Sequence, residues 1–147
     1  MWEGPSAEGA PPAGGRYYPD RDAWAPMDQT GAPQGSGNRA IAVGRRMILF
    51  GLSQTGTRWE RVAGVYDAEL DSWGPLLSRC GPDARLNPEL AWTGDGLIFW
   101  GGSSEECLSS APEDCRERAW HLPSEAVLSE LPEDRPGCSC PPPLGAD

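Results

Sequence analysis

Two short runs of apolar residues, each closed by a glycine, form the clearest hydrophobic pattern in this chain. They are Met47–Phe50 and Leu97–Trp100, and a turn-forming glycine precedes each run. Four apolar residues between glycines are too few for a buried helix and predict a buried β-strand. A shorter apolar stretch lies ahead of each run, at 40–43 and 90–92. Each pair of stretches therefore predicts a hairpin.

A second element repeats at nearly the same interval. Gly15, Tyr17, Asp22 and Trp24 recur 49 residues later as Gly64, Tyr66, Asp71 and Trp73, and a proline stands two residues after each tryptophan, at Pro26 and Pro75. Each aspartate is expected to bond its own downstream backbone and fix a turn. Each tryptophan is expected to cover a sheet face and to donate its indole N–H to a carbonyl. The prolines are expected to end strand pairing. A fixed period of this kind predicts a tandem β-repeat.

Composition supports an all-β fold. The 147 residues include 19 Gly and 16 Pro, which helices tolerate poorly. Residues 1–123 hold the repeats, near 1–51 and 52–102, with a degraded copy in 103–123 that is marked by Trp120. Residues 124–147 form an acidic, proline-rich segment. It predicts one short helix at 124–131, capped by Ser124, followed by a disordered tail.

The repeated sequence pattern resembles that of the kelch repeat. It is carried by the strand Leu97–Trp100 with its glycine doublet, by Gly14–Tyr17 with Trp24, and by Tyr66 with Trp73. The sequence looks most like bacterial kelch proteins that are related in fold to galactose oxidase. The resemblance implies a β-propeller, of which this chain would supply two complete and two partial blades. An incomplete propeller of this kind is expected to self-associate through its exposed blade edges.

The resemblance gives the repeated residues structural roles rather than catalytic ones. They are Gly15, Tyr17, Asp22, Trp24, Gly51, Gly64, Tyr66, Asp71, Trp73, Gly101, Gly102 and Trp120. The glycines that close the strands are expected to adopt positive φ and let the chain leave the sheet.

The predicted function is that of a non-enzymatic scaffold that binds a protein or a carbohydrate, without cofactor or metal. Two alternatives stay open: a fragment of a galactose-oxidase-like enzyme whose metal ligands lie outside this chain, and a truncated gene product without independent function. A copper site of that family needs several imidazoles and phenolates, and His121 is the only histidine.

Charge and cysteine content limit the partners and the compartment. The net charge is −10 and no basic stripe is present, which argues against binding of nucleic acid. No apolar run approaches the ~20 residues of a membrane span, and no secretion signal is visible, although the resemblance implies an exported parent protein. Of the five cysteines, Cys107 and Cys115 are candidates for a disulfide in an oxidising compartment. Cys138 and Cys140 are too closely spaced for the usual zinc pattern.

Overall fold

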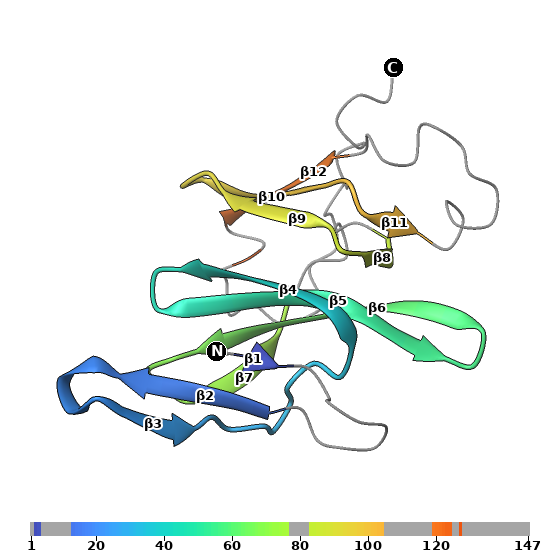
Figure 1. The fold of residues 1–147 in the computed structure, drawn as a ribbon. Helices are drawn as coiled ribbons and strands as arrows, with labels where there is room; N and C mark the ends of the chain where they lie inside the picture. The colour runs from blue at the N-terminus through green and yellow to red at the C-terminus, as the bar shows by residue number, and fades with distance from the viewer. Residues whose placement is uncertain (1, 4–12, 77–82, 105–118, 125–126, 128–147) are drawn as a thin grey trace.

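The structure is a computed structural model that describes residues 2–3, 13–76, 83–104, 119–124 and 127. Its strands pair only in antiparallel fashion and form four sheets, none of which closes on itself in the described part of the chain (Figure 1). The all-β prediction is confirmed. Ser124 and Val127 are helical, and the rest of the helix predicted at 124–131 lies outside the described residues.

The central sheet has four strands that follow one another in sequence. They are β4 (Ser36–Val43), β5 (Arg46–Thr55), β6 (Arg58–Asp67) and β7 (Ser72–Pro75), in the order β4-β5-β6-β7. The first two turns have two residues each and begin with Gly44 and Gly56, at φ 60° and 63°. A left-handed first residue matches the twist of a tight hairpin, and glycine adopts it without a Cβ clash. The hairpin predicted around Met47–Phe50 is confirmed.

The first sheet repeats the pairing of the central one. It contains β1 (Trp2–Glu3), β2 (Ala13–Tyr18) and β3 (Ala23–Pro26), and a 3-10 turn, η1 (Pro19–Arg21), joins the last two strands. Tyr17 lies opposite Trp24 just as Tyr66 lies opposite Trp73, and each proline ends its strand opposite a glycine. The pairing of β2 with β3 therefore equals that of β6 with β7 at an offset of 49.

The third sheet has the order β12-β10-β9. These strands are β9 (Glu89–Trp92), β10 (Gly96–Trp100) and β12 (Ala119–Pro123), and β8 (Arg85–Leu86) pairs separately with β11 (Ser103–Ser104). Leu97 lies opposite Trp92, which reproduces the pairing of Met47 with Ala42 fifty residues earlier. The second predicted hairpin is confirmed, and it follows the first hairpin at the predicted interval of 50 residues.

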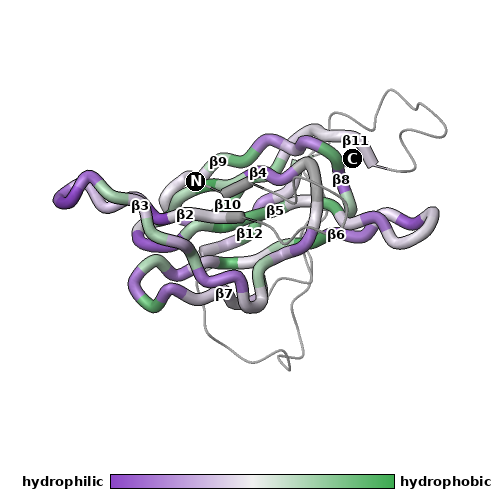
Figure 2. Tube along the Cα trace, turned by 60° about the horizontal axis from the view of Figure 1, so that its bottom comes forward, coloured by the Kyte–Doolittle hydropathy of each residue, from purple (hydrophilic) through white to green (hydrophobic). Residues whose placement is uncertain are grey.

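The main core lies between the central and third sheets, which are stacked in Figure 1. The rings of Phe50 and Phe99 meet edge to face with centroids 5.0 Å apart. Around them the cluster contains Val43, Ile48, Leu97, Leu122 and Val127, all buried. Hydrophobic residues lie along the paired strands, whereas the tip of the hairpin between β5 and β6 is polar (Figure 2). The short apolar runs therefore supply the core, as their pattern predicts.

Three expectations about the strands differ from the structure. Gly51 does not close its strand, because β5 continues to Thr55 and pairs along its whole length with β6. Trp100 ends its apolar run but is 44% exposed. Trp120 lies opposite Phe99, the place that Gly64 takes opposite Leu49, so it does not occupy the position of Trp24 and Trp73.

The glycine doublet after β10 behaves as expected. Gly101 and Gly102 have φ of 65° and 74° and lead the chain out of the strand. A Cβ on Gly102 would lie 2.7 Å from the carbonyl oxygen of Leu86, so this position also requires the absence of a side chain.

Candidate functional site

A tyrosine, an aspartate and a tryptophan form the same local arrangement in the first and central sheets. The hydroxyl of Tyr66 donates to Oδ1 of Asp71 at 2.6 Å, and its ring lies 5.2 Å from that of Trp73 at an angle of 50°. In the first sheet the hydroxyl of Tyr17 donates to Asp22 at 2.6 Å, and the ring lies 5.3 Å from its tryptophan at 45°. We call each set a Tyr-Asp-Trp triad: Tyr17, Asp22 and Trp24, and Tyr66, Asp71 and Trp73.

The aspartates reach their tyrosines because their backbones are left-handed. Asp22 has φ of 46° and Asp71 of 52°, a conformation that aspartate adopts more readily than most residues. Within the described residues, neither side chain makes the downstream turn bond that the sequence suggested. Asp67 makes that bond instead, since its Oδ1 accepts from the N–H groups of Glu69 at 3.0 Å and Leu70 at 3.3 Å.

The second triad joins the first sheet and the loop that follows it, together called the first unit, to the central sheet. Asp71 accepts the backbone N–H of Asp28 at 3.0 Å, and its second oxygen pairs with Arg16 at 2.7 Å. In return the indole N–H of Trp73 donates to the carbonyl of Asp28 at 2.9 Å, as the sequence predicted for a repeat tryptophan. Two residues of the first unit therefore make three polar contacts with one triad of the next.

These contacts shift the titration of the triad. The hydrogen bond from Tyr66, the N–H of Asp28 and the charge of Arg16 all favour the carboxylate, and they lower the pKa of Asp71. Burial of the phenol and its hydrogen bond to Asp71 raise the pKa of Tyr66 well above its ordinary value. The carboxylate at this junction is therefore ionised, and the phenol is neutral, over the physiological range.

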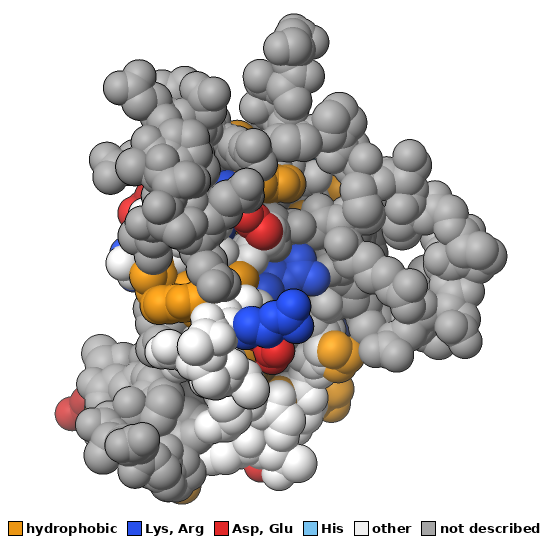
Figure 3. Space-filling view, turned by 90° about the vertical axis from the view of Figure 1, so that its right-hand side faces the viewer, with side chains coloured by type: hydrophobic (Ala, Val, Ile, Leu, Met, Phe, Trp, Pro, Cys, Tyr) orange, Lys and Arg blue, Asp and Glu red, His pale blue; other side chains and the backbone are white. Residues whose placement is uncertain are grey.

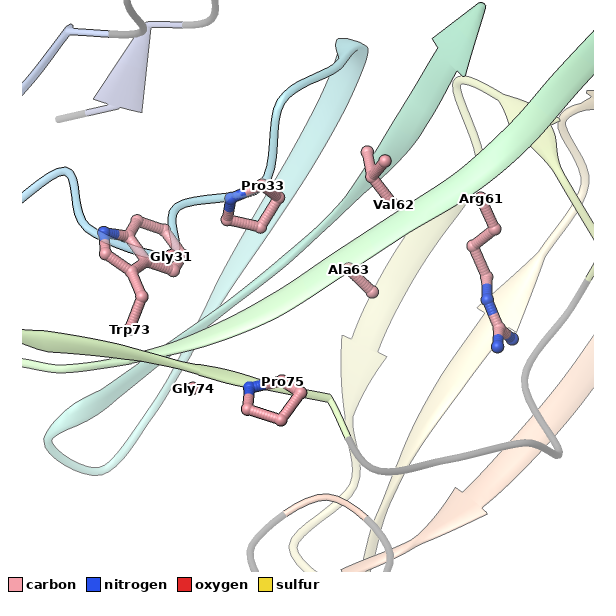
Figure 4. Close-up of a pocket in the computed structure, with 8 residues that line it drawn as sticks. All are labelled: Gly31, Pro33, Arg61, Val62, Ala63, Trp73, Gly74 and Pro75. Carbon is pink, nitrogen blue, oxygen red and sulfur yellow. The ribbon is translucent and has the colours of Figure 1, made fainter. Parts of the chain in front are cut away.

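Beside this junction lies a groove of about 380 Å³ (Figure 4). Its lining comes from the loop before β4 and from β6 and β7, namely Gly31, Pro33, Arg61, Val62, Ala63, Trp73, Gly74 and Pro75. Figure 4 shows Trp73 and Pro33 near one end and Arg61 at the other. Gly64 makes this packing possible, because a Cβ there would lie 2.6 Å from Cγ of Pro33 and 3.3 Å from Cε3 of Trp73.

The groove is apolar with one cationic end. Arg61 is half-buried, and this burial lowers the pKa of its guanidinium. On the face of the molecule that Figure 3 shows, basic side chains lie near the centre with carboxylates beside them. The described residues that line the groove carry no carboxylate, imidazole, hydroxyl or thiol. They can bind a ligand by apolar contact and charge, and they offer no group for proton transfer or nucleophilic attack.

Arg85 is a structural residue that the sequence pattern did not reveal. Its side chain is 1% exposed, and it donates to the carbonyls of Gly101 at 3.1 Å and Gly102 at 3.2 Å. It also pairs with Asp83 at 2.7 Å and lies 4.5 Å from the ring centroid of Trp120. Trp120 is thus a contact of a buried arginine rather than a member of a third triad.

The other predicted residues do not converge on a site. His121 lies on β12 opposite Ile98, beside the space left by Gly96. Cys107 and Cys115 lie outside the described residues, as do the other three cysteines. In the described part of the chain no group of three His, Cys, Asp or Glu residues is arranged to hold a metal ion. Within the same residues, no helix is long and apolar enough to cross a membrane.

No protein-family model matches the chain.

Proposed function

We propose that this chain is a segment of a kelch-type β-propeller, related in fold to galactose oxidase, and that it acts as a non-enzymatic binding scaffold. The observation that carries this proposal is the recurrence of one triad in the same strand register at a period of 49. A blade of a propeller is a four-stranded sheet, and β4 to β7 have that form. A kelch repeat has about 50 residues, which agrees with both intervals in this chain.

The groove beside Trp73 supports a binding role better than a catalytic one. Its described lining offers proline and tryptophan surfaces together with the charge of Arg61. Binding sites of this kind are concave and mainly apolar, with a few placed polar groups that orient the ligand. The ligand that fits best is a carboxylate on an apolar or ring-shaped frame. An acidic side chain of a protein partner and an acidic sugar share that chemistry.

Titration with two sets of probes tests this proposal. One set consists of acidic peptides and the other of uronic-acid oligosaccharides, each with its neutral amide as a control. We expect one set to bind, and we expect Arg61→Gln to weaken it by about 10- to 100-fold, the ~1.5–3 kcal/mol of a hydrogen bond to a charged group. Arg58→Gln is the matched control, since Arg58 lies exposed at the start of the same strand and outside the groove.

The two probe sets also decide the source of the ligand. Binding of the peptides identifies a protein partner, and binding of the oligosaccharides identifies a glycan. Equal affinity for the acids and their amides, or equal losses in the two arginine variants, would contradict the proposal. Failure of both sets to bind would contradict it as well.

A further inference from the structure

The groove beside Trp73 has two chemically different ends. The indole N–H of Trp73 already donates to the carbonyl of Asp28 at 2.9 Å, so this side chain offers a ligand its ring rather than its donor. Pro75 is exposed and a Cβ on Gly74 would meet nothing within 4 Å, so the space beside them is open. Arg61 lies at the other end (Figure 4). The groove therefore matches a ligand that carries both apolar rings and a carboxylate.

Proline supplies rings that fit such a surface. Proline-rich segments bind in aromatic-lined grooves because they are extended before they bind and lose little conformational entropy. Proline also has no backbone N–H, so it leaves no donor unsatisfied against an apolar wall. A proline-rich peptide that also carries carboxylates is thus a ligand that both ends of the groove accept.

The chain itself contains a sequence of this kind in residues 132–147, which we call the acidic proline segment. It has five prolines, three of them consecutive, and three acidic side chains against one arginine, namely Pro132, Pro136, Pro141, Pro142, Pro143, Glu133, Asp134, Asp147 and Arg135. The segment lies outside the described residues. The other acidic stretch of this part of the chain, 105–118, has one proline. Only the segment therefore combines the two features that the groove accepts.

The described chain leads up to this segment from the core beside the groove. Val127 is the last described residue before the segment, and it is buried in the core cluster between the central and third sheets. Ala63 lines the groove and packs against the same cluster, as does Leu76, the residue after Pro75. Pro141 follows Val127 by 14 positions, a reach of up to ~45 Å. A domain of 100 residues has a radius of gyration of only ~13 Å, so the segment is long enough to reach the groove.

We infer that the acidic proline segment binds in the groove of its own chain, with prolines against Trp73 and Pro75 and a carboxylate at Arg61. This inference rests on the proposed function, because it names a competitor that regulates access to the same groove. A ligand on a short flexible link has an effective concentration of about 1 mM. With a dissociation constant of about 0.1 mM, the segment would weaken the binding of an external ligand by about 10-fold.

Competition in the full chain tests the inference. The segment variant combines six substitutions, namely Glu133→Gln, Asp134→Asn, Pro141→Ser, Pro142→Ser, Pro143→Ser and Asp147→Asn. The probe is a synthetic peptide of residues 132–147 with serine in place of its two cysteines, and its affinity is measured by calorimetric titration. We expect the peptide to bind the segment variant about 10-fold more tightly than the unmodified chain, in which the groove is occupied. Adding Arg61→Gln to the segment variant should weaken this binding by about 10-fold or more.

The matched control carries Glu113→Gln and Asp114→Asn in the full chain. These residues follow Pro112 just as Glu133 and Asp134 follow Pro132, so the same Pro-Glu-Asp sequence loses its charge in a stretch without the proline run. The control should bind the peptide as weakly as the unmodified chain does. An equal gain of affinity in the control and in the segment variant would show a general effect of charge and would overturn the inference.

The remaining outcomes separate this inference from the proposed function. Equal affinity of the peptide for the unmodified chain and the segment variant, or no binding to the variant, would overturn the inference alone if the acidic probes described above still bind and depend on Arg61. Failure of every probe on both chains would instead contradict the proposed function. Analytical ultracentrifugation covers the last case: a dimer that the unmodified chain forms and the segment variant does not would place the segment in the groove of a second copy, which overturns the contact within one chain.

Discussion

Gly64 lies at a tight contact beside the repeat junction, and its replacement by alanine gives a quantitative test. The new Cβ would lie 2.6 Å from Cγ and 3.0 Å from Cδ of Pro33, and 3.3 Å from Cε3 of Trp73. Ordinary carbon–carbon contacts lie at ~3.5–4.0 Å, so the proline ring must move by roughly 1 Å. Pro33 is buried and Trp73 is held by its bond to Asp28, so neither can withdraw freely.

The size of the effect follows from two opposing contributions. Overpacking of a fitted contact destabilises by ~1–3 kcal/mol. Alanine also reduces the conformational entropy of the unfolded chain, which stabilises the protein by ~0.4–1 kcal/mol where the backbone can accept alanine. Gly64 belongs to a strand and has no positive φ, so the second contribution applies. We expect Gly64→Ala to lower the free energy of unfolding by about 1–2 kcal/mol, near the middle of the difference between these two ranges.

Gly15 is the matched control because it holds the equivalent place in the first unit. A Cβ there would lie 3.1 Å from Cε3 of Trp24, and no proline ring is near. The ring of Trp24 is 60% exposed and can shift into water. Gly15→Ala should therefore change stability by less than ~0.5 kcal/mol.

Urea unfolding of both variants, followed by far-UV circular dichroism, measures these free energies from the midpoint and the m-value. Unchanged stability of Gly64→Ala would refute the packing of Pro33 and Trp73 on this strand. Equal losses in the two variants would refute the distinction between a covered and an open triad.

Three further predictions concern the core and the titrating groups. Phe50→Ala should destabilise by ~3–5 kcal/mol in urea unfolding, because it removes the ring that meets Phe99 in the fully buried core; a loss below 1 kcal/mol would contradict that packing. The pKa of Asp71 is lowered on folding, so its carboxylate stabilises the fold above its unfolded pKa of ~3.9, and this stabilisation is lost as the pH falls through its folded pKa. Between pH 7 and pH 2, the melting temperature of Asp71→Asn should therefore fall less steeply than that of the unmutated protein. The pKa of Tyr66 is raised by burial and by Asp71, so its phenol should stay protonated through pH 11 in the folded protein. Ultraviolet titration of the unmutated protein and of Tyr66→Phe measures this. If the titration step that is missing in Tyr66→Phe has the ordinary tyrosine pKa of ~10, the prediction is wrong.

The hairpins could be predicted from the sequence because each one pairs strands that are consecutive along the chain. Glycine-bounded apolar runs predicted the hairpins, and the spacing of tyrosine, tryptophan and proline predicted the period of the repeat, whereas the register of these strands came from the structure. The extension of β5 past Gly51 does have a signal in the sequence. The two-residue turn Gly56-Thr57 separates two polar stretches that pair with each other.

The contacts between repeat units could not be predicted from the sequence in the same way. Asp71 meets Arg16 and Asp28, which precede it by 55 and 43 residues, and no local pattern links residues at such separations. The difference in exposure between the two tryptophans has the same origin. Trp24 and Trp73 each lie opposite a tyrosine in the same strand register, but only Trp73 bonds to the carbonyl of Asp28, 45 residues away along the chain.

The central claim is that Asp71 joins one repeat unit to the next through groups of the preceding unit. A double-mutant cycle on Arg16→Gln and Asp71→Asn tests it most directly, with unfolding free energies measured in urea for the original chain, both single variants and the double variant. If the 2.7 Å ion pair joins the units, the double variant will lose clearly less stability than the sum of the two single variants. Losses that simply add would contradict the claim, because they would show that Arg16 and Asp71 act independently.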